Sequence, residues 1–193
     1  MIFLDTFNGS RTWAAGSQSD QWGRDHGQWD YVGGQLQLLP NAGYGLWPPA
    51  PTDTAGMTDV QITATARIMR GAGEIGVWCR GGGIDEPRYS FYLSTTQAVS
   101  IVIEGTSSGR TLVNYLAAPM VRPYADNIIT AECRETGQGV ELRLTVNGQL
   151  AATASDDASL AAGGSVGADA VTWSSANPQA VDARFSAFQV DEQ

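Results

Sequence analysis

The segment from residue 140 to residue 155 most constrains how this chain can fold. From Val140 to Val146, apolar residues occupy every second position, and Glu, Arg and Thr occupy the positions between them. This period of two is typical of a β-strand with one buried face. Asn147-Gly148 follows, and this pair accepts the positive φ angles of a type I′ turn. The segment therefore predicts an antiparallel hairpin with residues 149–155 as its second strand.

One residue of this hairpin conflicts with the pattern. A strict two-residue turn pairs Thr145 with Leu150 and places Leu150 on the polar outer face. Two explanations are open: another layer or a partner covers Leu150, or a β-bulge shifts the register by one residue. An apolar residue left on the outer face would favour assembly with another protein.

Alternating or apolar runs separated by glycine-rich turns continue along the chain and predict further strands. One short stretch, residues 156–162, has the composition of a helical turn. Many short strands with almost no helix indicate an all-β protein, a sandwich or jelly roll of two antiparallel sheets. The predicted strands cover residues 2–7, 28–32, 35–39, 60–70, 74–80, 88–94, 99–104, 111–117, 127–134, 140–146, 149–155, 164–168 and 183–190.

The composition fits a single globular domain over residues 1–193. Hydrophobic residues make up 42% of the chain and charged residues 16%. The net charge is −9, all basic residues are Arg, and none form a stripe, which argues against nucleic acid and anionic membranes as partners. No apolar run reaches the ~18 residues that a membrane-spanning helix needs.

The start of the chain carries no signal-peptide pattern, because Met1 leads almost directly into the first predicted strand. We therefore expect either a secreted protein whose leader is missing from this sequence or a protein that reaches its destination by another route.

The two cysteines, Cys79 and Cys133, each lie on the apolar face of a predicted strand. Two readings are open: a disulfide formed in an oxidising place, or two free thiols that pack as small apolar residues.

Catalytic motifs are sparse. The single histidine, His26, lies in a turn-like segment and predicts a surface or loop position, and no Gly-x-Ser-x-Gly elbow is present. Glycoside hydrolysis needs two facing carboxyl groups, and no pair stands at strand spacing. Glu132 and Glu135 are three residues apart, Asp85 and Glu86 are adjacent in a loop, and Glu74 and Glu104 stand alone. We therefore expect no enzymatic activity.

Metal binding has equally little support. Oxygen ligands at a loop edge, from Asp156, Asp157 and nearby carbonyls, are the one arrangement that suits a structural calcium ion. No Asp-x-Asp-x-Asp loop accompanies them, so we expect solvated charges beside a turn, and no cofactor.

Aromatic residues are the main binding candidates. Six Trp and six Tyr are present, and the long proline-rich loop of residues 41–57 holds Tyr44 and Trp47. Exposed rings stack on the apolar faces of sugars, while the alternative for each ring is a plug in the core. Trp29 and Tyr31 alternate in a strand, Trp78 faces away from Cys79, and Trp13 and Trp173 lie in or beside loops.

The order of several short motifs resembles the laminin G-like branch of the concanavalin A-like jelly rolls over nearly the whole chain. The motifs are Leu4-Asp5-Thr6-Phe7-Asn8, Trp22 and Trp29, Gly33-Gly34-Gln35-Leu36, residues 76–80, 89–93, 127–133, 142–148, 164–167 and 185–190. The resemblance implies two antiparallel sheets of about six or seven strands, with the first and last strands paired. It also implies a disulfide between Cys79 and Cys133.

The resemblance implies several biological settings. Such modules occur as carbohydrate binders, as extracytoplasmic sensor or adhesion domains, and in minor tail or decoration proteins of actinobacterial phages. The opening residues resemble the phage proteins, although Gly9 stands where those have Arg. The family's glycosidases carry Glu motifs that this chain lacks.

From these observations we predict a non-enzymatic virion protein, in a phage tail or capsid decoration, that contacts other virion proteins or itself and binds host-surface glycan. The alternative is an exported carbohydrate-binding or sensor domain at the cell surface, and a glycoside hydrolase is the third candidate. The residues predicted to contact glycan are Tyr44, Trp47, Arg80 and Trp173.

Overall fold

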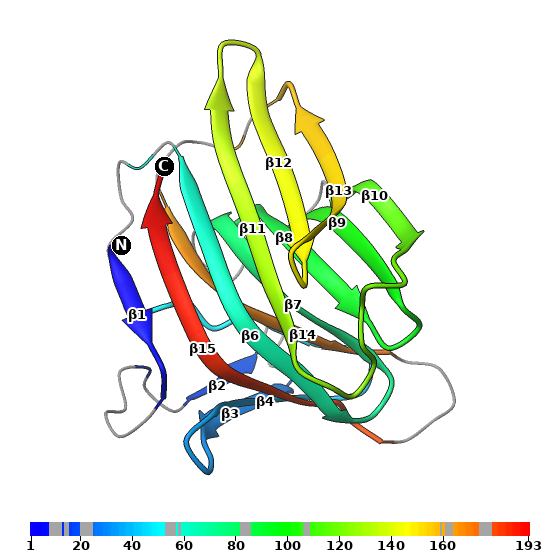
Figure 1. Cartoon of the computed structure of the whole chain (residues 1–193). Coiled ribbons are helices and arrows are strands. Elements are labelled where there is room, and N and C mark those ends of the chain that lie inside the picture. The colour runs from blue at the N-terminus through cyan, green and yellow to red at the C-terminus, as the bar shows by residue number, and fades with distance from the viewer. Residues whose placement is uncertain are drawn as a thin grey trace.

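The computed structural model shows a sandwich of two antiparallel β-sheets (Figure 1). The structure describes residues 1–7, 13, 16–19, 25–52, 57, 59–81, 86–105, 109–158, 160, 164–173 and 179–193. Gly9 and Trp22, two positions of the family comparison, lie outside these ranges. No described segment forms a helix that is long and apolar enough to cross a membrane.

The larger sheet has nine strands, and β1 and β15 pair within it, so the two ends of the chain lie side by side (Figure 1). This pairing of first and last strands is the one that the family resemblance implies. In sheet order the strands are β13 (Gln149–Asp156), β12 (Gly139–Val146), β11 (Asn127–Thr136), β6 (Val60–Arg70), β15 (Asp182–Glu192), β4 (Leu36–Pro40), β3 (Asp25–Tyr31) and β2 (Gly16–Ser19), with β1 (Phe3–Asp5) beside β15.

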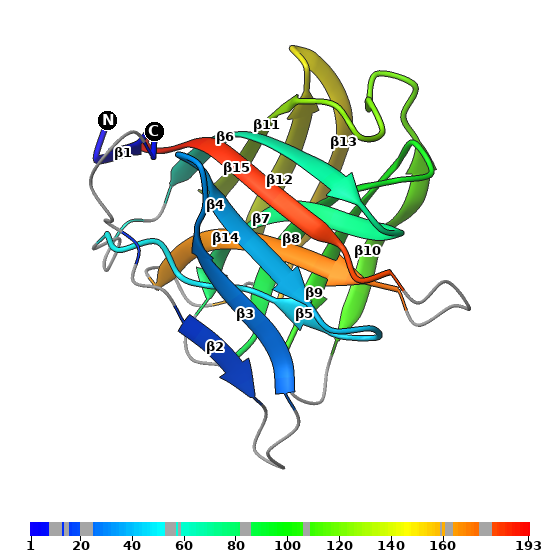
Figure 2. The same ribbon diagram turned by 90° about the horizontal axis from the view of Figure 1, so that it is seen from below.

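The smaller sheet has six strands and forms the second layer (Figure 2). In sheet order these are β10 (Arg110–Ala117), β9 (Ala98–Glu104), β8 (Arg88–Ser94), β7 (Gly73–Gly81), β14 (Ser165–Thr172) and β5 (Gly45–Leu46). The two sheets, with nine and six strands, thus differ more in size than the resemblance implies, since it implies about six or seven strands in each.

The core lies between the sheets and follows the predicted alternation. On β6 every second residue from Val60 to Ile68 is buried, and on β12 every second residue from Val140 to Val146 is buried. The outer face of the larger sheet is mostly polar, which is the usual one-sided burial of an antiparallel sheet. Strands β7 and β8 differ, because every residue of both strands is buried. Both faces of β7 and β8 are therefore buried, whereas β10 at the edge of the same sheet is largely exposed.

Most predicted strands are present with ends shifted by one or two residues, and β6 and β8 match their predicted ranges. Four differences stand out. Residues 164–168 predict only half of β14, which runs to Thr172, and the sequence pattern does not predict β2. The long loop of residues 41–57 contains the short strand β5. Residues 156–158 form the end of β13 and a turn, and part of the expected helical turn lies outside the described residues.

The hairpin resolves the conflict at Leu150. Thr145 pairs with Leu150, as a strict two-residue turn requires, and Leu144 pairs with Ala152. A bulge therefore follows Leu150, and it returns Ala152 to the buried face. Leu150 remains on the outer face and is 52% exposed. The bulge thus corrects the register only for the residues after Leu150, and no layer of the described structure covers Leu150 itself.

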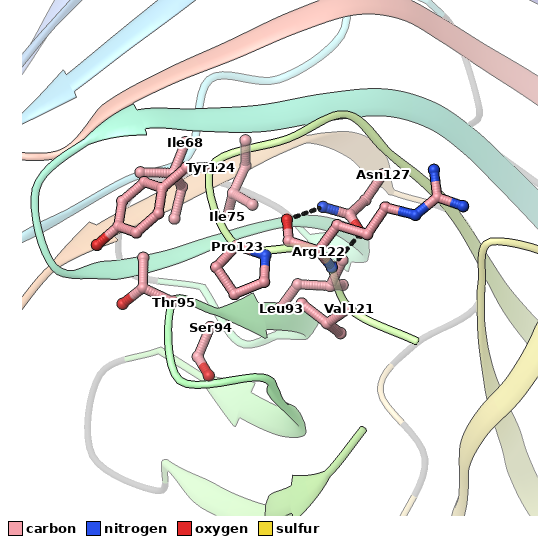
Figure 3. Close-up of a pocket in the computed structure, with 10 residues that line it drawn as sticks. All are labelled: Ile68, Ile75, Leu93, Ser94, Thr95, Val121, Arg122, Pro123, Tyr124 and Asn127. Atoms are coloured by element: carbon pink, nitrogen blue, oxygen red, sulfur yellow. Dashed lines mark hydrogen bonds between the residues drawn. The ribbon is translucent and has the colours of Figure 1, made fainter. Parts of the chain in front are cut away.

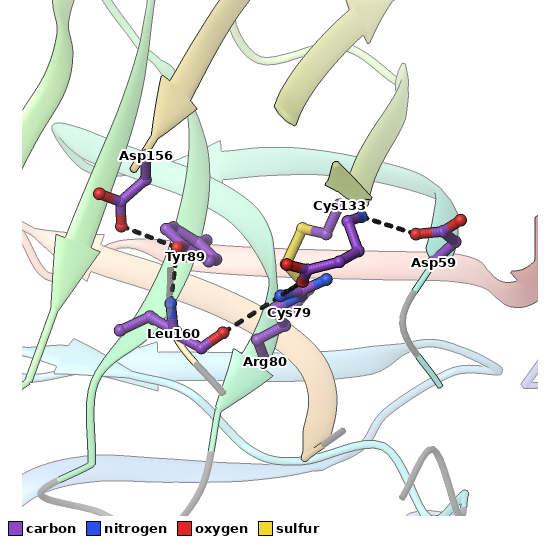
Figure 4. The surroundings of a disulfide bond; sticks show 8 residues. Asp59, Cys79, Arg80, Tyr89, Cys133, Asp156 and Leu160 are labelled. Carbon is purple, nitrogen blue, oxygen red and sulfur yellow. Dashed lines mark hydrogen bonds and ion pairs between the residues drawn. A yellow bond between two sulfur atoms is a disulfide. The ribbon is translucent and has the colours of Figure 1, made fainter. Parts of the chain in front are cut away.

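A disulfide joins Cys79 of β7 to Cys133 of β11 and so links the two sheets (Figure 4). Their Cα atoms are 6.7 Å apart, and both residues are buried. The pairing is the one that the family resemblance implies. Next to it, the Tyr89 hydroxyl donates to Asp156 and accepts from the backbone N–H of Leu160, which holds the segment after β13 against the smaller sheet (Figure 4).

Candidate functional site

The outer face of the six-stranded sheet carries an unusual set of polar and aromatic side chains. On β7, Ile75, Val77 and Cys79 belong to the core, so Glu74 and Trp78 face outward. The same alternation directs polar residues of β8, β9 and β14 to this face, joined by rings from neighbouring segments. We call the following residues the outer cluster: Trp47, Glu74, Arg88, Ser90, Tyr92, Glu104, Tyr115, Asp169 and Trp173.

A glycine in the middle strand lets distant members of the cluster meet. Gly76 of β7 pairs with Asp169 on one side and with Tyr92 on the other. A Cβ at Gly76 would collide with the carbonyl of Phe91 and the ring of Tyr92. Because no side chain stands there, the Asp169 carboxyl reaches across β7 to the Tyr92 hydroxyl, at 2.7 Å.

Glu104 and Asp169 share two hydroxyl groups at the centre of the cluster. The Tyr92 hydroxyl lies 2.7 Å from Oε2 of Glu104 and 2.7 Å from Oδ2 of Asp169. The Ser90 hydroxyl lies 3.0 and 3.1 Å from the same two oxygens. The two carboxyl oxygens are therefore no farther apart than twice 2.7 Å. Two hydroxyl protons can fill only two of these four contacts, and a proton on one carboxyl fills a third.

Burial explains which carboxyl keeps that proton. Asp169 is fully buried, and this burial raises its pKa from 3.8 to about 8. The negative charge of Glu104 raises the pKa of Asp169 further, whereas Arg88, Tyr92 and Ser90 oppose the rise. Asp169 is thus held as a neutral acid over most of the ordinary pH range, and it donates where an ionised carboxylate would only accept.

Arg88 is the cation of the cluster, and it lies under Trp47. Its guanidinium donates to Oε2 of Glu104 at 2.6 Å, and its Nε is 3.8 Å from Oδ2 of Asp169. The guanidinium carbon is 4.0 Å from the centre of the Trp47 ring, a distance at which a cation is attracted to the ring face. Only 4% of the Arg88 side chain is exposed, so its charge serves the cluster rather than solvent.

Glu74 lies at the other end of the cluster with Tyr115 and Trp173. The centres of these two rings are 6.2 Å apart. Tyr115 belongs to β10 and Trp173 follows β14, and three strands lie between β10 and β14 in the sheet. An irregular register in β10 between Val113 and Leu116 and a positive φ at Tyr115 accompany this placement. Burial raises the pKa of Glu74 to about 7, with Tyr115 and Trp173 lowering the pKa and Glu104 raising it.

The predicted glycan-binding residues separate into two groups. Trp47 and Trp173 belong to the outer cluster, at its two ends. Tyr44 and Trp47 both contact the His26 ring, whose centre is 4.6 Å from that of Tyr44 and 5.7 Å from that of Trp47. Arg80 lies apart from the cluster, and only 2% of its side chain is exposed. It donates to Glu135 and to the carbonyl of Leu160, so it does not form part of a binding surface (Figure 4).

Several other expectations are corrected by the fold. His26 is not a surface or loop residue, since it lies on β3 and is 8% exposed. Trp13, by contrast, agrees with the core alternative expected for each ring, because it is buried and packs against Phe188. Glu74 and Glu104 do not stand alone, because the sheet brings them together with Asp169. Asp85 lies outside the described residues.

The suggested calcium ligands do not form an open site. Asp156 is 2% exposed and binds Tyr89 and Arg110. Among the described residues, no group of three or more His, Cys, Asp or Glu side chains is arranged to hold a metal ion.

Sequence reasoning missed most of the outer cluster. Arg88, Ser90 and Tyr92 alternate with Tyr89, Phe91 and Leu93, which is the pattern of a half-buried strand with solvent on its polar side. One signal is present in the sequence, since the polar positions of several predicted strands carry Glu, Asp, Arg and Tyr. Only the order of the strands in the sheet shows that these side chains contact one another.

A small pocket lies elsewhere, beside the β6–β7 hairpin (Figure 3). It is open to solvent, and its walls include Ile68, Ile75, Leu93 and Tyr124. Asn127 forms the opposite side and fixes the adjoining loop through hydrogen bonds to both the N–H and the carbonyl of Arg122 (Figure 3). The pocket shares no residue with the outer cluster.

No family model and no curated protein sequence matches this chain. Its fold nevertheless resembles several solved structures. A lichenase, a β-1,3-1,4-glucanase from a mouse hindgut metagenome, is 14% identical with a TM-score of 0.66, over 99% of each chain. The carbohydrate-binding module CBM66 from Bacillus subtilis is 14% identical with a TM-score of 0.60, over 82% of this chain and 88% of the module. The Emp46p carbohydrate recognition domain is 10% identical with a TM-score of 0.58, over 94% and 88%. The protein therefore has the jelly-roll fold of concanavalin A-like proteins.

Proposed function

We propose that this protein binds carbohydrate on the outer face of its six-stranded sheet. The observation that carries the proposal is the arrangement of the outer cluster, with aromatic rings at both ends and hydrogen-bonding groups between them. Trp47 lies over Arg88, where β8 begins, and Glu74, beside Tyr115 and Trp173, pairs with Ser94, where β8 ends. That strand has 7 residues and so spans about 20 Å.

The chemistry of the cluster suits a sugar. Sugar rings have apolar faces that pack on aromatic side chains, and their hydroxyl groups need donors and acceptors fixed at defined positions. Glu104 supplies an acceptor, because Arg88, Ser90 and Tyr92 all bind Oε2 while 32% of the side chain is exposed. Tyr115 is 50% exposed and offers a ring at the surface. The similar solved structures, which include a carbohydrate-binding module and a glucanase, support this choice of ligand.

We further propose that binding occurs without hydrolysis. Glu104 and Asp169 are close enough to suggest a retaining glycosidase, whose two carboxyl groups stand about 5–5.5 Å apart. Asp169 is fully buried, however, and its Oδ2 is held by Tyr92 and Ser90. It therefore has no path to an anomeric carbon. Release of reducing sugar from a β-glucan or chitin substrate, abolished by Glu104→Gln, would contradict this part of the proposal.

A glycan array followed by calorimetry on the best ligand tests the proposal. Trp47→Ala is expected to weaken binding about tenfold, the usual loss when a central aromatic anchor is removed. Tyr124→Ala is the matched control, since Tyr124 is 54% exposed but lines the separate pocket. Thermal unfolding of both variants checks that they fold. Equal affinity of Trp47→Ala and the natural protein would remove the outer cluster from the binding site.

The finer role expected from the family resemblance stays a prediction: a virion tail or decoration protein that contacts other virion proteins. Leu150 and Ile128 are 52% and 50% exposed on the outer face of the larger sheet, and they suit a protein contact. Mass spectrometry of purified particles would detect the chain if this prediction holds. The exported alternative predicts a leader or a membrane anchor encoded upstream, and an extracellular location agrees with the disulfide.

A further inference from the structure

Trp47 is contacted by residues of both sheets. It follows β5, the edge strand of the six-stranded sheet, and its ring lies over Arg88 of that sheet. Two further contacts come from the nine-stranded sheet. Gln18 of β2 accepts a hydrogen bond from the backbone N–H of Trp47, and the ring of His26 of β3 lies 5.7 Å from the Trp47 ring. The nine-stranded sheet therefore contributes to a site that lies on the other sheet.

Resting on the carbohydrate-binding function proposed above, we infer that His26 is a positioning residue that holds the ring of Trp47 over Arg88 in the orientation that receives the ligand. His26 is 8% exposed, so its effect on the ligand passes through Trp47.

The backbone on both sides of Trp47 is already fixed. Leu46 pairs with Ala170 of β14 and is fully buried. Pro48 follows Trp47, and a residue that precedes proline is restricted to extended conformations. The side-chain oxygen of Gln18 holds the Trp47 N–H at 3.2 Å. The rotamer of the Trp47 side chain is what remains to be chosen, so the contacts of the ring decide where it lies.

His26 supplies a contact that selects this rotamer. Its ring meets the Trp47 ring at 70°, with the ring centres 5.7 Å apart, which is the edge-to-face geometry that aromatic pairs favour. The Tyr44 ring packs on His26 as well, with centres 4.6 Å apart and planes 32° apart. Because His26 is buried and packed against two rings, it has little room to move. It is therefore a rigid support for Trp47.

Arg88 alone would not orient the ring as well. A cation over a ring face favours a short distance to that face, but it does not fix the direction in which the ring edge points. The edge-to-face contact with His26 adds that second restraint. A ring that is oriented before the ligand arrives loses less conformational entropy on binding, so the ligand binds more tightly.

Gln18 indicates that the support is kept at a cost to stability. The side chain is 5% exposed, its Oε1 accepts from Trp47, and its Nε2 has no hydrogen-bond partner within the described part of the chain. A buried donor without an acceptor is destabilising, and an apolar side chain of similar size would avoid that cost. Such an exception needs an explanation, and the orientation of Trp47 supplies one.

NMR of the Arg88 side chain tests the inference without any ligand. The guanidinium carbon lies 4.0 Å from the centre of the Trp47 ring, so the ring current should shift the Nε proton of Arg88 upfield. The reference is the Nε proton of Arg80, a buried arginine that binds Glu135. His26→Leu removes the supporting ring and should abolish most of the upfield shift. His26→Phe keeps a ring at this position and should retain the shift, and Trp47→Ala gives the unshifted value.

Calorimetry with a β-1,4-linked glucose tetramer tests the same role in binding. His26→Leu should weaken binding about fivefold, within the range that one aromatic pair contributes, and His26→Phe should restore most of the affinity. In a Trp47→Ala background, His26→Leu should change the affinity by less than about twofold, because the first substitution has already removed the ring through which His26 acts. A histidine that touched the ligand itself would weaken binding in both backgrounds.

An Arg88 upfield shift that survives His26→Leu, or equal losses of affinity in the two backgrounds, would overturn the inference and leave carbohydrate binding intact. Thermal unfolding checks that each variant folds. If the variants do not fold, the natural protein still decides: magnetisation transfer between the ring protons of His26 and Trp47 is expected, and its absence would overturn the inference. If no glycan binds, on the array or in calorimetry, the proposed function fails, while NMR still shows whether His26 orients Trp47.

Discussion

Glu104 and Asp169 lie on strands three places apart in the six-stranded sheet, yet their carboxyl groups share the hydroxyls of Tyr92 and Ser90. The contact is made possible by Gly76, which leaves an opening on the strand beside Asp169. The arrangement ties the stability of the protein to the protonation of a buried acid. It also places that acid directly beneath the proposed binding surface.

The buried acids predict that stability falls as pH rises. Asp169 keeps its proton up to a pKa of about 8 in the folded protein, whereas the ordinary value is 3.8. Glu74 behaves in the same way, with a pKa of about 7 against 4.5. Between these values the unfolded chain has released protons that the folded protein retains, so raising the pH favours unfolding. We expect a loss on the order of several kcal/mol between pH 5 and pH 8.5, measured by urea unfolding.

Asp169→Asn serves as the control for that pH dependence. The amide copies the shape and donor capacity of the neutral acid and does not ionise. The variant should match the natural protein near pH 5 and exceed its stability above pH 8. Parallel curves for the two proteins would show that Asp169 is not the group responsible.

Tyr92→Phe tests the shared hydroxyl directly. The substitution removes a donor that lies 2.7 Å from both carboxyl groups, and it leaves buried oxygens with fewer partners. The expected cost is about 1–3 kcal/mol in the free energy of unfolding. Tyr124→Phe is the matched control, because that hydroxyl makes one exposed contact, at 3.3 Å to the carbonyl of Gly71. It should change stability by less than about 0.5 kcal/mol.

Removing the disulfide should destabilise the sandwich strongly. Cys79 and Cys133 are separated by 54 residues, and a bridge across a loop of that length restricts the unfolded chain by about 4 kcal/mol in the entropic treatment. Replacing both cysteines by alanine is expected to cost about 2–4 kcal/mol, measured by chemical denaturation. The same loss should appear when the natural protein is unfolded under reducing conditions. A change below about 1 kcal/mol would mean that packing, rather than the bridge, holds the sheets together here.

Asn147 is predicted to act through its side chain as well as its backbone. Its Oδ1 accepts from the backbone N–H of Ile128, and its Nδ2 donates to the carbonyl of Met120 and to Asn127. Asn147→Gly keeps the left-handed backbone and loses these bonds, so we expect a cost of about 1–3 kcal/mol. Gly148→Ala is a control for the backbone alone, because nothing lies within 4 Å of the added Cβ while φ at this position is +78°. The strained φ of the alanine should lower the free energy of unfolding by about 1 kcal/mol.

The sequence predicted the strands well because their signal is local. A buried face recurs at every second residue, and the turn residues between strands have their own φ preferences. The outer cluster is different, because the polar side of β8 has the same pattern whether it faces water or a cluster of carboxyl groups. Along the sequence Glu74 and Glu104 stand alone, since their neighbours in the chain carry no matching acid. The matching acid, Asp169, comes from β14, two strands away from β8.

The sequence alone determined the hairpin, through the alternation from Val140 to Val146 and the Asn147-Gly148 turn. Together with the other strand patterns it also determined the all-β class. Both could be predicted because a strand pattern and a turn depend on residues only a few positions apart. Tertiary structure alone decided that Leu150 stays outward beside a bulge, that Arg80 is buried against Glu135, and that Glu104 and Asp169 share a proton-bearing network. These depend on the order of strands in the sheet. Strand order follows from the packing of the whole core, which no local pattern specifies.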